Sequence, residues 1–307
     1  MSFAQRPTYD WRLRTRTIAL GRRTLIMGIL NVTPDSFSDG GHFYDAASAP
    51  ERAVAHALQL LDHGADLLDL GGESTRPNAT RLSPDEEQAR VLPVLEALLR
   101  ERPRTIVSID TFHAATAKRA VDAGAEIVND VSGGLWDSDM LATLTELQCG
   151  AILMHTRGAP PEWRSQPALL PNEVLPLVFT GLEARLAAAT QAGIASDQIV
   201  LDPGLGFGKR LDENYPLLAH LAEFHQLNRP ILVGASRKSF LAQTIAQAPN
   251  LTAVHEGAPP PANARLNATT AANVAAILAG AHILRVHEAQ PTAEAAAIAD
   301  RILQGFE

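Results

Sequence analysis

Cysteine is almost absent from this chain of 307 residues, since Cys149 is the only one. One cysteine cannot form a disulfide within the chain, nor a metal cluster built on cysteine ligands. Long apolar runs are missing as well: none approaches the roughly 20 residues of a membrane-spanning helix, and the N-terminus lacks the apolar core of a secretion signal. We therefore expect a cytoplasmic protein without a membrane partner.

Basic residues do not dominate, because the formal net charge is −8. An acidic chain is poorly suited to nonspecific binding of nucleic acid, so we expect no nucleic-acid partner. A site for an anionic substrate would need its arginines and lysines concentrated locally. Apolar residues make up 46% of the chain, which supports a large core, and the length suits one barrel domain with insertions.

What the chain does contain is a rhythm of short apolar runs, each ending in polar residues or glycine. The runs lie at residues 25–31, 66–77, 105–111, 126–130, 151–155, 199–209, 231–240 and 283–287. Stretches of helical length, several with the period of an amphipathic helix, lie at residues 50–63, 84–100, 114–123, 138–147, 172–192, 214–224, 269–279 and 292–304. Several runs are apolar throughout, as expected of strands covered on both faces.

Strand–helix units repeated in this way, without hairpin turns between them, predict an α/β protein with a single TIM-type (β/α)8 barrel. The barrel should occupy residues 24–307 and follow an N-terminal extension, residues 1–23. Within that extension, residues 9–20 alternate partly with period two and are interpreted as a strand or hairpin that closes the bottom of the barrel. Residues 247–265, which include Pro259–Pro261, are interpreted as a mobile insertion after the seventh strand.

Polar side chains gather where these runs end, and in such a barrel the carboxyl ends of the strands meet on one face. The first run opens into the loop NVTPDSFSDGG, residues 31–41, which is rich in Asp, Ser and Gly. Asp110, Asn129 and Asp202 lie at or next to the ends of three further runs. Their oxygens could accept hydrogen bonds from a flat heterocycle rich in donors. Taken singly, each could instead be a helix cap or a loop anchor.

A second group of strand-end residues is basic. Arg76, Arg285 and His287, together with Asn31, come from the first, second and eighth runs, which are neighbours in a closed barrel. Two guanidinium groups and an imidazole can clamp a phosphate or diphosphate, and a carboxylate of the first loop, such as Asp39, could hold Mg²⁺ against that anion. The alternatives are a surface arginine and a rim histidine with a structural partner.

Familiar catalytic motifs offer no other explanation. The segment GLGFGKR, residues 204–210, has three residues between its outer glycines where the Walker pattern needs four, and Arg210 stands where that pattern needs Ser or Thr. Around Ser236, the segment GASRK has Lys238 where the hydrolase nucleophile elbow needs glycine. We therefore expect neither a phosphate-binding loop of the Walker type nor a nucleophilic serine.

The chain resembles the dihydropteroate synthase family of folate biosynthesis from about residue 24 to about residue 290. The resemblance rests on the motifs NVTPDSFSDGG, GGESTRP, SIDT, ND, LDPGLGFGK, SRKS and RVH, which occur in the order of that family. It implies a transferase that condenses 6-hydroxymethyl-7,8-dihydropterin diphosphate with para-aminobenzoate, giving 7,8-dihydropteroate and diphosphate. It also implies Mg²⁺ as cofactor, a homodimer, and binding of sulfonamides as aminobenzoate mimics.

The resemblance assigns roles to individual residues. Those that match pterin-binding residues of the family are Asp110, Asn129, Met154, Asp202, Phe207, Gly234, Lys238 and Arg285. Those that match the diphosphate site are Asn31, Arg76, Arg285 and His287, and those near the metal are Asn31 and Asp39. Those at the aminobenzoate site are Thr75, Arg76 and Ser239. The residues implied to be catalytic are Asp110, Lys238, Arg285 and His287.

The family's mechanism, as the resemblance implies it, breaks the C–O bond first and leaves a pterin methylene cation, which a carboxylate such as Asp110 would stabilise. Two other interpretations stay open. A methyltetrahydrofolate-binding methyltransferase barrel shares the Asp/Asn floor but does not need the basic clamp, and a catalytically silent pterin-binding barrel does not need both halves of the site. The chain departs from the family pattern at Ala268, where Gly is usual, and at Glu288, where Asp is commoner.

Overall fold

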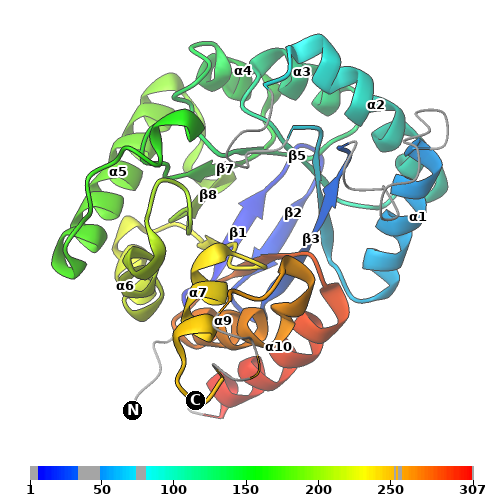
Figure 1. The fold of residues 1–307 in the computed structure, drawn as a ribbon. Coiled ribbons are helices and arrows are strands. Elements are labelled where there is room, and N and C mark those ends of the chain that lie inside the picture. The colour runs from blue at the N-terminus through cyan, green and yellow to red at the C-terminus, as the bar shows by residue number, and fades with distance from the viewer. Residues whose placement is uncertain (1–5, 34–48, 74–80, 252–253, 255–257, 306–307) are drawn as a thin grey trace.

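The computed structural model describes residues 6–33, 49–73, 81–251, 254 and 258–305, and within them parallel strands form one closed barrel (Figure 1). The sheet order is β8-β7-β6-β5-β4-β3-β10-β9. The strands are β3 (Leu25–Asn31), β4 (Leu67–Gly71), β5 (Val107–Asp110), β6 (Ile127–Asp130), β7 (Gly150–Met154), β8 (Ile199–Asp202), β9 (Leu232–Val233) and β10 (Ile283–Val286). A parallel bridge between Leu201 and Ile231 joins β8 to the approach of β9 and closes the ring. The predicted TIM-type barrel is confirmed.

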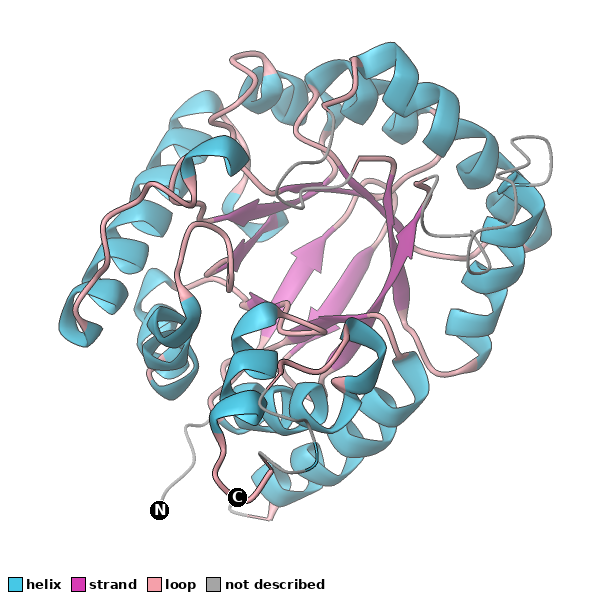
Figure 2. Ribbon diagram, in the orientation of Figure 1, coloured by secondary structure: helices cyan, strands magenta, loops and turns pink. Residues whose placement is uncertain are grey.

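Helices surround the strands on the outside, as Figure 2 shows. They are α1 (Ala49–Asp62), α2 (Pro84–Glu101), α3 (Ala114–Asp122), α4 (Met140–Leu147), α5 (Pro171–Ala192), α6 (Tyr215–Ala219), α7 (Ser239–Gln247), α9 (Leu266–Leu278) and α10 (Ala289–Gln304). Local sequence sets their ends: Ser83 and Glu86 form a capping box at the start of α2, and Gly193 ends α5 in the left-handed conformation.

The apolar faces of these helices and the outward side chains of the strands form the main core. Cys149 lies within it and is buried. Burial raises the pKa of the Cys149 thiol to about 12, so the thiolate that would react is absent near neutral pH. Cys149 is therefore an inert core residue.

One predicted helix is interrupted. The pattern predicts a helix over residues 214–224, whereas the structure has a 3-10 turn at Leu211–Asn214, the short helix α6, and a 3-10 segment at Leu221–Leu227. His220 leaves helical geometry, with φ −113° and ψ 22°, and this ends α6 after little more than one turn. Apolar side chains on both sides of the break remain buried, so packing on the barrel decided the outcome rather than helical continuity.

An antiparallel hairpin, β1 (Tyr9–Arg12) and β2 (Thr17–Leu20), closes the N-terminal end of the barrel, as predicted. Trp11, Leu13 and Leu20 are buried, and the Trp11 indole N–H donates to the Gln198 carbonyl at 2.8 Å. These side chains pack on residues near the starts of the strands, namely Leu25, Met27, Leu67, Ile127, Ile152, Val200, Leu232 and Ile283. Among the described residues, no helix is both long and apolar enough to cross a bilayer.

Candidate active site

The carboxyl ends of neighbouring strands bring several predicted site residues to one level of the barrel. Asn31 at the end of β3 pairs in register with Gly71 of β4, Gly71 pairs with Asp110 of β5, and Asp110 pairs with Asn129 of β6. Because side chains on neighbouring strands at one level point the same way in a barrel, Asn31, Asp110 and Asn129 come close together. The sequence placed all three at strand ends, and the structure agrees.

An arginine joins these residues into one ionic centre. Arg285 of β10 donates from Nε to Oδ2 of Asp69 and from Nη2 to Oδ2 of Asp110, each at 2.5 Å. The side-chain amide of Asn129 donates to the same Asp69 oxygen at 2.9 Å. Asp69 lies in β4 and is fully buried. One buried carboxylate therefore orients both the amide of Asn129 and the plane of the guanidinium group.

The ionic centre changes the acidity of its members. Burial raises the pKa of Asp110 to about 7, and the negative charges of Asp69, Glu87 and Asp130 add to this effect, while Arg285 opposes it. Burial alone would lower the pKa of Arg285, but the carboxylates of Asp69 and Asp110 outweigh it and raise that pKa. Arg285 is therefore a permanent cation, whereas Asp110 holds a proton more readily than an exposed aspartate does.

A second part of the site lies at the ends of β7 and β8. Met154 pairs in register with Asp202, and burial raises the pKa of the Asp202 carboxyl, although the N–H of Gly204 donates to its Oδ1 at 2.7 Å. The ammonium of Lys238 lies 4.0 Å from the centre of the Phe207 ring, a cation–π contact. Burial also lowers the pKa of Lys238 to about 8. Met154 and Phe207 pack in one small apolar cluster.

The rim beside β9 and β10 holds the predicted histidine. Nδ1 of His287 lies 2.9 Å from the Ser236 hydroxyl, which also accepts the backbone N–H of His287 at 3.2 Å. Arg237 has a left-handed backbone, φ 59°, and donates its N–H to the Thr269 hydroxyl at 3.1 Å. Its guanidinium group forms an ion pair with Glu288. Glu288, where Asp is commoner in the family, keeps a carboxylate at this position, and that carboxylate pairs with Arg237.

The chain was compared with protein-family models and with known proteins. The family model described as "Pterin binding enzyme" matches residues 27–287. Dihydropteroate synthase of Escherichia coli K12 is 40% identical over 282 residues, which cover 92% of this chain and 93% of that protein. The chain belongs to the dihydropteroate synthase family.

Two further relatives show the range of this family. Dihydropteroate synthase of Xanthomonas albilineans, solved with 4-aminobenzoic acid, superposes with a TM-score of 0.82 at 37% identity, covering 95% of this chain and 98% of that one. The mitochondrial bifunctional folate-synthesis protein of Pisum sativum is 38% identical over 294 residues. These cover 92% of this chain but 54% of the pea protein, so the chain spans about half the length of that relative.

Within the described residues, the dihydropteroate synthase motifs converge as the sequence predicts. The predicted pterin residues divide between the ionic centre and the β7–β8 end, and Gly234 lies beside Arg285, because a Cβ built on Gly234 would be 3.8 Å from the Arg285 Cβ. Ser239 is the first residue of α7, immediately after Lys238. Asp39, Thr75 and Arg76 lie outside the described residues, so their assigned roles stay predictions.

Three polar residues of the site were not selected from the sequence: Asp69, Lys209 and Ser236. A signal existed for Asp69, since it is a carboxylate in the middle of the apolar segment LLDLG, and a buried charge needs a partner. Lys209 and Ser236 were considered only as parts of Walker and nucleophile motifs. The structure instead makes Lys209 a buried donor to three carbonyl groups and Ser236 the partner of His287.

Proposed function

We propose that this member of the dihydropteroate synthase family condenses 6-hydroxymethyl-7,8-dihydropterin diphosphate with para-aminobenzoate and releases 7,8-dihydropteroate and diphosphate. The observation that carries the proposal is the hydrogen-bonded group of Arg285, Asp69, Asp110 and Asn129 at the strand ends. It places acceptors suited to a pterin beside a permanent cation suited to its diphosphate.

Two fixed acceptors would read the edge of the pterin ring. The amide nitrogen of Asn129 donates to Asp69, so its oxygen is left as an acceptor for the substrate. Oδ1 of Asp202 accepts from Gly204, so its other oxygen is left for the same use. A pterin edge carries several N–H donors, which match this pair of acceptors. Phe207 and Lys238 would border the ring.

The diphosphate would lie against Arg285 and His287, with Arg76 of the second loop. The Ser236 hydroxyl accepts the backbone N–H of His287 and can donate its own proton to Nδ1. That arrangement leaves the ring proton on Nε2, where it can donate to a phosphate oxygen. Negative charge grows on the diphosphate as the C–O bond breaks, so these donors stabilise the transition state more than the bound substrate.

The end of β3 offers a ligand suited to Mg²⁺. A Cβ built on Gly71 would lie 3.6 Å both from Oδ1 of Asn31 and from Oδ2 of Asp110, so the carboxamide oxygen of Asn31 sits beside the ionic centre. Carboxamide and carboxylate oxygens are ligands that Mg²⁺ accepts, and we expect Asn31 and Asp39 to hold it. When bound, Mg²⁺ neutralises charge on the diphosphate.

The remaining roles follow from charge and position. Asp110, held by Arg285, would stabilise the pterin methylene cation that is left when the C–O bond breaks. The carboxylate of para-aminobenzoate would bind at the N-terminal end of α7, where Ser239 is the first residue, with Thr75 and Arg76. A homodimer and a cytoplasmic location stay predictions of the family resemblance.

The purified protein should form 7,8-dihydropteroate and diphosphate in equal amounts when it is given Mg²⁺, the pterin diphosphate and para-aminobenzoate. Chromatography measures the first product and an enzyme-coupled phosphate assay the second. Addition of EDTA should suppress both products, because an unneutralised diphosphate is a poor leaving group. Folded protein that yields neither product with Mg²⁺ present would contradict the proposed function.

A further inference from the structure

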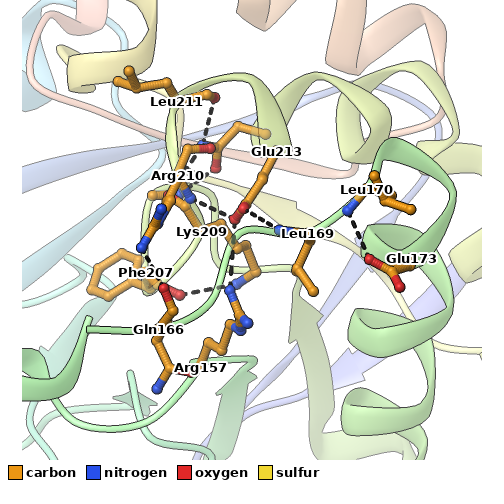
Figure 3. Close-up of polar contacts among 12 residues, drawn as sticks. Arg157, Gln166, Leu169, Leu170, Glu173, Phe207, Lys209, Arg210, Leu211 and Glu213 are labelled. Carbon is orange, nitrogen blue, oxygen red and sulfur yellow. Dashed lines mark hydrogen bonds and ion pairs between the residues drawn. The ribbon is translucent and has the colours of Figure 1, made fainter. Parts of the chain in front are cut away.

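The loop after β8, residues 203–210, is held to the loop after β7 by several polar contacts (Figure 3). Glu213 is buried and accepts the backbone N–H groups of Leu169 and Arg210 at 2.8 and 2.7 Å. Arg157 lies 3.8 Å from the same carboxylate, and the Arg210 guanidinium donates to the Gln166 carbonyl at 2.5 Å.

Asn214 and Lys209, both buried, also hold this loop, and Oδ1 of Asn214 accepts the N–H of Gly206 at 2.6 Å. Lys209 is 5% exposed, and its ammonium donates to the carbonyl groups of Gly204, His155 and Phe207 at 2.7, 3.0 and 3.3 Å. Three acceptors satisfy the three N–H donors of an ammonium group. Such full pairing is what a buried cation requires. Lys209 therefore links the β7 loop to two points of the β8 loop.

Glycine makes this convergence possible. Gly204 has a left-handed backbone, φ 66°, and a Cβ built there would lie 2.0 Å from the His155 carbonyl oxygen. No other residue would let the two loops approach closely enough for one ammonium to reach both carbonyls. Gly206 and Gly208 are also left-handed, so between Gly204 and Lys209 only Leu205 and Phe207 have side chains that can hold the loop.

The carbonyl groups that Lys209 binds belong to residues that shape the pterin side of the site. Gly204 donates its N–H to Asp202 and its carbonyl accepts from Lys209, so the lysine fixes the group that orients this carboxylate. The Phe207 carbonyl accepts a hydrogen bond from Lys209, and the Phe207 ring makes a cation–π contact with the ammonium of Lys238. A shift of this loop would therefore move the acceptor and the aromatic wall together.

We propose that Lys209 is a positioning residue for pterin binding, an inference that rests on the proposed function. It holds Asp202 and the Phe207 ring at fixed places relative to Lys238, and it touches neither the substrate nor the diphosphate. Its removal should therefore weaken binding of the pterin, while the step that breaks the C–O bond, which depends on the Arg285 centre, keeps its rate.

The test compares Lys209→Met with the wild type. Methionine keeps the length and apolar volume of the side chain but removes the charge and all three donors. The dissociation constant of bare 6-hydroxymethyl-7,8-dihydropterin, from calorimetry, should rise at least about tenfold, as the KM of the pterin diphosphate should. The kcat and the KM of para-aminobenzoate should stay within about threefold of the wild type.

Arg210→Met is the matched control, because it also removes a cation-to-carbonyl contact between the two loops, but an exposed one. It should bind the pterin like the wild type. Lys209→Arg keeps the charge but cannot place one nitrogen among three carbonyls, so its pterin affinity should fall between those of Lys209→Met and the wild type. If Lys209→Met does not fold, the test uses Lys209→Arg instead.

Unchanged pterin affinity in the folded Lys209 variants, or an equal loss in Arg210→Met, would overturn the positioning role. A fall in kcat at constant KM would overturn it as well. A wild type that binds no pterin would overturn the proposed function together with this inference, whereas a wild type that binds and turns over leaves the two separable.

Discussion

Replacement of Asp202 by asparagine should weaken binding of bare 6-hydroxymethyl-7,8-dihydropterin by roughly 30- to 1000-fold, or about 2–4 kcal/mol. The reason lies in the fixed neighbour of this side chain. The N–H of Gly204 donates to Oδ1 of Asp202 at 2.7 Å, so an asparagine must keep its oxygen there. Its amide nitrogen then faces the pterin, and a donor meets a donor where a charged acceptor stood.

Calorimetric titration of the bare pterin measures this effect without the diphosphate. Asp197→Asn is the matched control, since Asp197 is an exposed carboxylate that pairs with Arg12 at 3.1 Å in the segment before β8. The control should bind the pterin like the wild type. Equal affinity of Asp202→Asn and the control would mean that Asp202 does not face the pterin.

Replacement of Arg285 by lysine should lower kcat/KM for the pterin diphosphate by roughly 150-fold, or about 3 kcal/mol, the lower end for breaking a buried ion pair. Lysine keeps the charge but offers one nitrogen, whereas Arg285 donates from Nε to Asp69 and from Nη2 to Asp110. Asp69 is fully buried, and of its two donors among the described residues it would keep the amide of Asn129 and lose Nε of Arg285. The substitution should therefore disturb the orientation of the pterin-binding acceptors as well as the binding of the diphosphate.

Steady-state kinetics with both substrates varied measures this prediction. Arg102→Lys is the control, because Arg102 makes an exposed single contact with Asp62 at 3.1 Å, and exposed pairs of this kind contribute little. The loss in Arg285→Lys should appear in kcat as well as in KM, since the guanidinium group acts on charge that grows during the reaction. A variant with normal kcat would limit Arg285 to substrate binding.

The strand ends were predictable because apolar runs alternate with stretches of helical length, and each run ends in polar residues or glycine. Runs of apolar residues that stop at a polar residue placed Asp110, Asn129 and Asp202 correctly at the carboxyl ends of β5, β6 and β8. The hairpin that closes the opposite end followed from its alternation. Each of these features depends on residues that are close in the chain, and local pattern is sufficient for such features.

The partners inside the site were not predictable in the same way. Arg285 meets Asp69 and Asp110 across 216 and 175 residues of sequence. Which carboxylate an arginine meets is set by the closure of the barrel and by the register of its strands, and neither is a local property. Lys209 was missed for a related reason: its acceptors are backbone carbonyl groups, which leave no mark in the side-chain pattern.

In the proposed function, the strand ends divide into a part that binds the pterin and a rim that acts on the diphosphate. Titration of bare 6-hydroxymethyl-7,8-dihydropterin into His287→Ala, beside Asp202→Asn, tests this division most directly. His287 is hydrogen-bonded to Ser236, which follows β9. We expect His287→Ala to bind the bare pterin within about threefold of the wild type and mainly to lose turnover. A loss of pterin affinity in His287→Ala as large as that in Asp202→Asn would contradict it.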